Sequence, residues 1–294
     1  MRLGYACVNT GLPSSGRTMR LANATPERLR EVIAGNLDAL EAILRWNADH
    51  GIEVFRLTSD LIPFASHPVN RLCWWEEFAS RFADLAAVIR DGGARISTHP
   101  GQYTVLSSAS VEVVEAAVAE LVYHDRLLEA LGLDASHKIV LHVGSGTGDA
   151  ATAARLRSRV AALPAGPRSR LVLENDERWT LAAMLAIGAD CAAPIVFDAF
   201  HHRLAPSLEG VGLHELAERA AATWKTPDGR PEVHFSTQAP GRRPGAHAET
   251  LDLAAFAPFV EEVGGMPLDC ILEVKDKERS LLRARPLIAA DLTP

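Results

Sequence analysis

Cysteine is scarce in this chain, and its spacing excludes two common kinds of site. The four cysteines are Cys7, Cys73, Cys191 and Cys270, and no two of them form a CxxC pair. A zinc ribbon and a dithiol redox motif both depend on such pairs. We therefore expect free thiols in a reducing compartment.

Long apolar runs are also absent. None approaches the length of about 18 residues that a membrane-spanning helix needs, and the N-terminal MRLGYACVNTG lacks the basic-then-apolar layout of a signal peptide. The 294 residues contain no low-complexity segment, charge block or long linker. The sequence thus predicts one domain over residues 1–294, located in the cytoplasm and without a membrane partner.

An excess of positive charge is missing as well. Lys and Arg number 30 against 37 Asp and Glu, which gives a formal net charge of −7. This sum argues against a nucleic-acid partner. Bound divalent cations are not counted in it, however, so metal ligands can reverse the sign of a binding face.

The chain does have a regular alternation of short apolar runs with amphipathic stretches. The amphipathic stretch at 25–51 is the clearest, with Thr25 as N-cap, Pro26 at the first helical position and Gly51 as the stop. The apolar runs are typical of strands covered on both faces. They span residues 2–8, 54–59, 95–100, 138–144, 170–176, 194–201, 231–238 and 269–276. Eight strands alternating with helices predict an α/β fold, a single (β/α)8 TIM barrel.

A doubly wound open sheet is the alternative fold. It would usually carry a phosphate-binding GxGxxG after its first strand, and GYACVNTG is not one. The glycine-rich GSGTG at 144–148 is interpreted as a tight turn beside a site.

Polar side chains gather at the expected C-terminal ends of the strands, where a TIM barrel has its active site. Burying them unpaired would cost several kcal/mol each. Divalent cations remove that cost, because imidazole and carboxylate are their natural ligands. The sequence therefore predicts a metal centre at this face. The side chains are His67, His99, His142, His201, His202, His234 and His247, with Glu174, Asp198 and Glu273.

The stretch LVLENDER at 171–178 is the most informative of these ends. Glu174 directly follows a buried apolar run, where its carboxylate can bridge two cations about 3.5–4 Å apart. Asn175 and Asp176 are interpreted as supporting and N-cap residues for a helix that starts near Trp179. A capped loop with a surface salt bridge is the alternative, and it leaves Glu174 unpaired.

Five motifs stand out along the chain: FRLTSDLIPFASHP (55–68), STHPGQY (97–103), LENDE (173–177), FDAFHH (197–202) and RRPGAHAE (242–249). In this order and spacing they resemble the UV damage endonucleases. These are barrel enzymes related to the endonuclease IV class of abasic-site nucleases. The opening RLGYACVNTGL followed by RTMRLAN is similar to that family too, so the resemblance covers nearly the whole chain.

The resemblance implies up to three divalent metals per chain. They hydrolyse the phosphodiester 5′ to pyrimidine dimers and 6-4 photoproducts in duplex DNA, which initiates excision repair. Manganese is favoured because no cysteine is among the ligands, and zinc tolerates the same set. By similarity, His99, His142 and Glu174 hold the first metal; Glu174, Asp198, His234 and Glu273 the second; His201 and His247 the third.

The resemblance also implies catalytic and DNA-contacting residues. Glu174 and His234 are expected to be essential, and His67 is either a metal-site or a phosphate-contacting histidine. Gln102 and Tyr103 are expected to insert into the duplex opposite the lesion, where Tyr103 replaces stacking of about 1–3 kcal/mol per base. Their alternative role is to cover the barrel mouth. Tyr5 and Asn9 are implied as contacts to extruded nucleotides.

UV-damaged double-stranded DNA is thus the implied partner, and one site facing a duplex fits a monomer. Three divalent ions would add about +6 at the binding face. Eight basic residues are expected on the same side: Arg17, Arg20, Arg178, Arg203, Arg242, Arg243, Lys275 and Lys277.

One position departs from the family pattern. Glu232 stands where we expect a lysine, two residues before His234. Strand alternation puts both residues on one face, so Glu232 points toward the metal end, where it supplies negative charge or a ligand. The coordination of the third metal depends on which of these two roles Glu232 has.

Two other functions compete with the nuclease hypothesis. An abasic-site endonuclease would use the same metals and differ only in substrate. A metal-dependent sugar isomerase would use carboxylates and a catalytic lysine in its site, with fewer histidines than this chain has.

Overall fold

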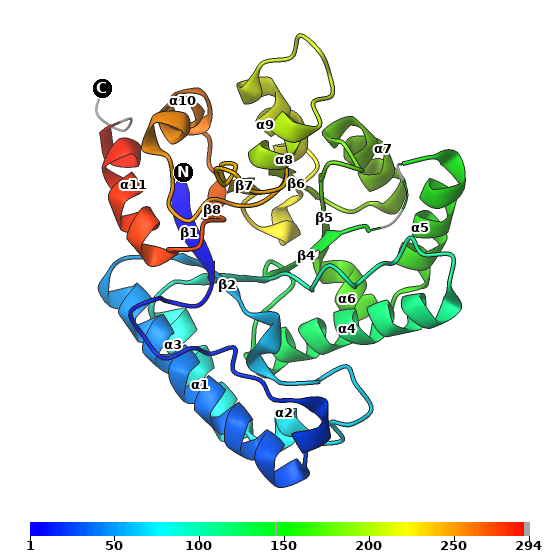
Figure 1. Cartoon of the computed structure of the whole chain (residues 1–294), viewed down its shortest axis with the longest axis vertical. Coiled ribbons are helices and arrows are strands. Elements are labelled where there is room, and N and C mark those ends of the chain that lie inside the picture. The colour runs from blue at the N-terminus through cyan, green and yellow to red at the C-terminus, as the bar shows by residue number, and fades with distance from the viewer. Residues whose placement is uncertain (145, 147, 291–294) are drawn as a thin grey trace.

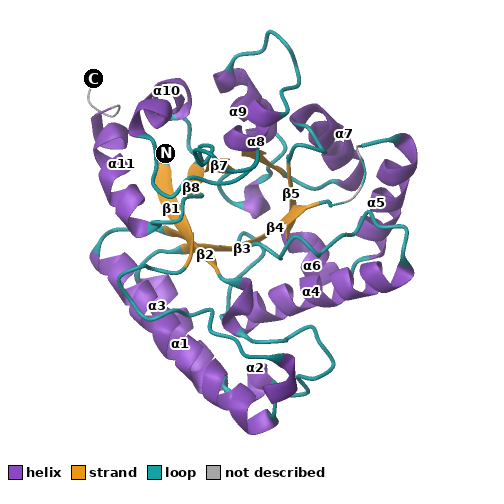
Figure 2. Ribbon diagram, in the orientation of Figure 1, coloured by secondary structure: helices purple, strands orange, loops and turns teal. Residues whose placement is uncertain are grey.

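Eight parallel strands close into a barrel in strict sequence order, as the sequence predicts (Figures 1 and 2). The computed structural model describes residues 1–144, 146 and 148–290. β1 pairs with β2 on one side and with β8 on the other, where Arg2 lies opposite Asp269. The strands are β1 Arg2–Cys7, β2 Val54–Leu57, β3 Arg95–Thr98, β4 Lys138–His142, β5 Leu171–Glu174, β6 Ile195–Asp198, β7 Glu232–Phe235 and β8 Asp269–Leu272.

Helices surround the barrel, and α11 at the end of the chain lies beside β1 at its start (Figure 1). None among the described residues is long and apolar enough to cross a membrane. The helices are α1 Pro26–Asp49, α2 Trp74–Glu77, α3 Ala79–Asp91, α4 Val111–Ala130, α5 Ala150–Ala162, α6 Ala165–Arg170, α7 Leu181–Cys191, α8 Ala199–Leu204, α9 Leu213–Ala221, α10 Leu253–Val263 and α11 Glu278–Ala290.

The signals at the two ends of α1 act as expected. The Thr25 side chain accepts a hydrogen bond from the backbone N–H of Arg28, and Pro26 opens the helix. Its end lies at Asp49, before Gly51, whose φ of +60° reverses the chain at little steric cost.

Alternation along the strands divides the protein into two cores. Outward-facing residues such as Phe55, Ile96 and Leu173 are fully buried under the helices. Inward-facing Val140, Val172 and Val196 form a separate cluster with Trp224. This two-sided burial is why most strand residues are apolar.

At the N-terminal ends of the strands, charged residues fill the barrel and neutralise one another. Arg95 Nη1 lies 2.8 Å from Asp269 Oδ2, and Arg2 Nε lies 2.7 Å from the other oxygen. Lys138 Nζ pairs with Asp228 Oδ1 at 2.5 Å. This network closes the end opposite the expected metal centre.

Two details refine the sequence analysis. The apolar run expected at 194–201 stops as a strand at Asp198, because the Asp198 carboxylate accepts the N–H of His201 and caps α8. In GSGTG, Gly144, Gly146 and Gly148 have φ of +88°, +91° and +74°, which agrees with a tight turn. Ser145 and Thr147 of that motif lie outside the described residues.

Candidate metal centre

The barrel places the expected ligands at one rim. His142, Glu174 and Asp198 are the last residues of β4, β5 and β6. His99 and Glu273 directly follow β3 and β8, and His234 lies within β7. Because inward positions alternate along each strand, all of these side chains meet in the mouth of the barrel.

Two groups of potential ligands result, and Glu174 belongs to both. The first group is His99, His142 and Glu174, and the second is Glu174, Asp198, His234 and Glu273. Within each group the ligand atoms lie within 4.8 Å of one another. Glu174 Oε2 is 2.9 Å from His99 Nε2, and Oε1 is 2.6 Å from His234 Nδ1. The fully buried carboxylate therefore turns one oxygen to each group, as a bridging ligand would.

The surroundings fix which nitrogen each imidazole turns to a metal. A backbone carbonyl can only accept a hydrogen bond, so His99 Nδ1 donates to Pro100 O at 3.1 Å. The Nε2 atom of His99 is then left to face a cation. His247 Nδ1 likewise donates to Glu273 O at 2.8 Å. His234 Nε2 contacts both Glu232 Oε1, at 3.0 Å, and Arg56 Nη2, while Nδ1 faces Glu174. Such partners are typical of metal-ligating histidines.

Buried atoms without hydrogen-bond partners show that the site fits cations. Asp198 Oδ2 and His142 Nδ1 are buried without a hydrogen bond among the described residues. Burial, with help from the neighbouring charges of Glu174 and Glu273, raises the pKa of Asp198 to about 7. Buried polar groups are normally satisfied, so an atom left without a partner in a carboxylate–imidazole cluster suits a metal.

Arg56 lies beside the second group, and the sequence analysis missed it. Its side chain is 4% exposed and forms an ion pair with Glu273, while Nη2 lies 3.5 Å from Glu232 Oε1. Although burial acts to lower it, Glu273 and Glu232 raise the pKa of this guanidinium above its ordinary value. The signal was available, because alternation puts Arg56 on the inner face with Val54.

Glu232 faces the interior as alternation predicts, but it lies outside both ligand groups. It is 1% exposed, and its Oε1 contacts His234 Nε2, Arg56 Nη2 and Ser97 Oγ. In this arrangement its carboxylate contacts His234 and shares Arg56 with Glu273.

The pair expected for a third metal lies next to the first group. The rings of His201 and His247 have centroids 5.8 Å apart, and His201 is 5.5 Å from His142. His201 Nδ1 is 3.1 Å from Glu177 Oε1. Neither histidine belongs to a group of three close ligands within the described part of the chain.

Four other expected residues have different fates. His67 is exposed, and its Nδ1 accepts the N–H of Val69, so it lies outside both groups. His202 packs its ring against Phe197. Tyr5 and Asn9, which are expected to contact extruded nucleotides, are both buried in this structure. Tyr5 is 0% exposed and donates to Asn47, because Gly4 and Ala6 take the inward positions of β1; Asn9 is buried and donates to the Tyr5 hydroxyl.

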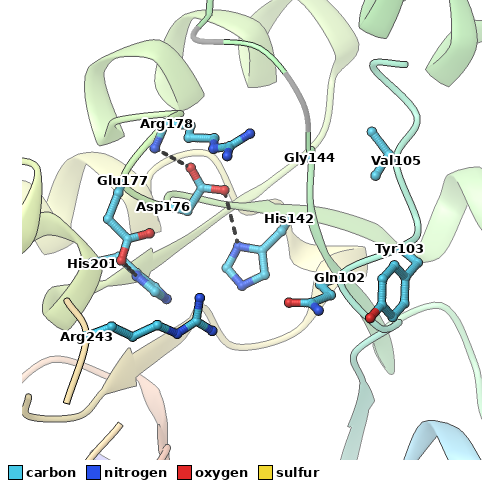
Figure 3. A pocket seen from close by; sticks show the side chains of 10 residues that line it. All are labelled: Gln102, Tyr103, Val105, His142, Gly144, Asp176, Glu177, Arg178, His201 and Arg243. Carbon is cyan, nitrogen blue, oxygen red and sulfur yellow. Dashed lines mark hydrogen bonds and ion pairs between the residues drawn. The ribbon is translucent and has the colours of Figure 1, made fainter. Parts of the chain in front are cut away.

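A pocket of about 460 Å³ opens beside the ligand groups (Figure 3). His142 and His201 line its interior, and Gln102 and Tyr103 lie on one side. Tyr103 is 82% exposed, so most of its ring faces solvent at the rim of the pocket.

Comparison with known proteins agrees with this geometry. The family model of UV-endonuclease UvdE matches residues 1–292. A UV DNA damage endonuclease of Clostridium perfringens is 33% identical over 289 residues, covering 96% of this chain and 69% of that protein. One from Bacillus cereus is 32% identical over 261 residues, covering 87% and 82%.

Solved structures similar to this chain fall into two classes, one with high sequence identity and one that shares only the fold. The crystal structure of SacUVDE has a TM-score of 0.92 at 36% identity and covers 99% of this chain and 98% of that one. Endonuclease IV from Thermus thermophilus has a TM-score of 0.56 at 16% identity, covering 99% and 100%. A D-psicose 3-epimerase from Clostridium cellulolyticum has a TM-score of 0.57 at 11% identity and covers 99% of this chain and 98% of that one. The last two share the fold alone, whereas the whole-chain matches show that this chain belongs to the UV-damage endonuclease family.

Proposed function

We propose that this protein is a metal-dependent hydrolase that cuts duplex DNA on the 5′ side of UV photoproducts. The observation that carries the proposal is the position of Glu174, which turns one oxygen to each of two ligand groups at the barrel mouth. Family membership supports the substrate, and the donor set supports the chemistry.

The proposed ligands follow from the contacts. His99, His142 and Glu174 hold one cation, and Glu174, Asp198, His234 and Glu273 hold a second. His201 and His247 are proposed for a third, and the oxygen–nitrogen donor set favours manganese while tolerating zinc. When bound, divalent cations supply a nucleophile at neutral pH and neutralise the charge that develops on the phosphate.

Groups of the chain itself prepare the site before substrate arrives. The backbone oxygen of Pro100 contacts His99 Nδ1, and the Glu232 carboxylate contacts His234 Nε2, so neither ring needs to rotate on binding. Such preorganisation lowers the cost of assembling the transition state. His67 is exposed on the loop after β2, and we propose it as a phosphate contact.

Gln102 and Tyr103 are proposed to probe the duplex for damage. Both are exposed and line the pocket that contains His142. Unstacking costs a few kcal/mol per step and costs least at a damaged base. Tyr103 offers an aromatic face in exchange. One mouth per chain is consistent with a monomer acting on one lesion.

Nicking of supercoiled plasmid tests the proposal. Irradiated and untreated plasmid are incubated with the protein and manganese, and only the irradiated plasmid should become relaxed. Equal nicking of both, or of neither, refutes the proposal. An oligonucleotide with one abasic site, compared with one carrying a pyrimidine dimer, separates the abasic-site alternative; faster cutting of the abasic duplex would favour it.

A further inference from the structure

The rim of the pocket carries two arginines that belong to neither ligand group. Arg178 comes from the loop after β5 and Arg243 from the loop after β7, and both line the pocket with His142 and His201 (Figure 3). Both side chains are exposed. Across the described residues, no acidic side chain forms an ion pair with either guanidinium.

The nearby carboxylates are engaged elsewhere. Asp176 Oδ1 accepts the backbone N–H groups of Arg178 and Trp179, each at 2.7 Å. Its Oδ2 lies 3.8 Å from His142 Nδ1, and Glu177 Oε1 lies 3.1 Å from His201 Nδ1. The two guanidinium groups therefore have no carboxylate partner among the described residues.

The backbone of Arg243 is held by a hairpin over residues 238–247. Gln238 donates its Nε2 to Arg243 O at 2.9 Å and accepts the N–H of Gly245 at 3.0 Å. Ala246 N also donates to Arg243 O. The hairpin ends at His247, whose Nδ1 donates to Glu273 O. The Arg243 backbone thus has a fixed position relative to an expected metal ligand.

We propose that Arg178 and Arg243 form a phosphate clamp, in which each guanidinium group binds a backbone phosphate near the one that is cut. Guanidinium groups recognise phosphate through paired hydrogen bonds, and two unpaired groups on one rim suit an anion. The clamp lies across the pocket from Gln102 and Tyr103 (Figure 3). It would fix the strand while those residues read the lesion.

The clamp rests on the proposed action on DNA, so its test avoids cleavage. The duplex carries one thymine dimer, and an uncharged methylphosphonate replaces the phosphate 5′ to it. Binding to the manganese-loaded protein is followed by fluorescence anisotropy over a range of salt concentrations. Arg178→Gln and Arg243→Gln should each reduce the slope of log affinity against log salt by about 0.9, the value for one lost contact.

A control lies at the opposite end of the barrel. Arg90→Gln removes the same charge from an exposed position near the end of α3, just before β3 begins, and it should leave the slope nearly unchanged. Arg243→Lys should keep the slope but bind more weakly. Because phosphate contacts carry no information about the base, the ratio of affinities for damaged and intact duplex should not change.

Three results would overturn the clamp. They are an unchanged slope in Arg178→Gln or Arg243→Gln, equal effects of Arg90→Gln and Arg243→Gln, or a changed ratio of affinities for damaged and intact duplex. Melting temperatures equal to that of the parent protein confirm that the variants fold. If the parent binds this duplex but never cuts an unmodified one, the proposed hydrolysis fails while the clamp stands.

Discussion

His234 and Glu232 lie two residues apart on β7 and form a buried pair, with 3.0 Å between Nε2 and Oε1. The pair is possible because both residues face the barrel interior. Its consequence is that His234 Nδ1 faces Glu174 at 2.6 Å. Glu232, which lies outside both ligand groups, thus contacts the side of a proposed ligand that faces away from Glu174, together with Arg56 Nη2.

Replacing Glu232 should weaken metal binding without removing a ligand. Partners one step away from a metal typically change its affinity about 10–100-fold, so we expect a loss in this range for Glu232→Ala. Glu232→Gln keeps an oxygen acceptor and should lose less. Manganese affinity measured by calorimetry checks both, and parent-like affinity in Glu232→Ala would show that the pair does not orient His234.

Glu174→Gln should nearly abolish cleavage. The change is almost isosteric, but it replaces one of the two oxygens that face the ligand groups with an amide. Because a partner one step away already costs up to about 100-fold, we expect a larger loss here. His234→Ala should do the same. Nicking of irradiated plasmid is the measurement, and near-normal activity of either variant would contradict the shared-ligand assignment.

Tyr103→Ala should reduce recognition of damage while sparing the metals. Loss of an aromatic stacking partner costs about 1–3 kcal/mol, and Tyr103 makes little contact with the rest of the protein because it is 82% exposed. Affinity for a dimer-containing duplex should fall toward that for an intact duplex. Tyr103→Phe should behave like the parent protein. A loss of bound metal in Tyr103→Ala would instead indicate a structural role.

Arg95→Met should lower stability at the end of the barrel away from the site. Removing one partner of a buried charge pair costs about 3–5 kcal/mol, and Arg95 is paired with the fully buried Asp269. Arg90→Met is the control, since its ion pair with Asp91 is exposed and should contribute at most about 1 kcal/mol. Urea unfolding measures the difference, and metal content should be unchanged in both.

The fold and most of the proposed ligands could be predicted because alternation ties sequence to direction. Glu174 ends an apolar strand, and a parallel barrel turns such an end into the mouth. Inward and outward positions also alternate along β1 and β2. Gly4 and Ala6 face inward, which leaves Tyr5 outside the barrel, and Arg56 faces inward too. His67 lies on a loop, where no periodicity fixes a side chain's direction.

Metal content of the purified protein tests the central claim most directly. After incubation with manganese and removal of the excess, elemental analysis should find at least two ions per chain, because two ligand groups share Glu174. Glu174→Gln prepared in parallel should retain fewer. A parent protein that retains no divalent ion under these conditions would contradict the metal centre.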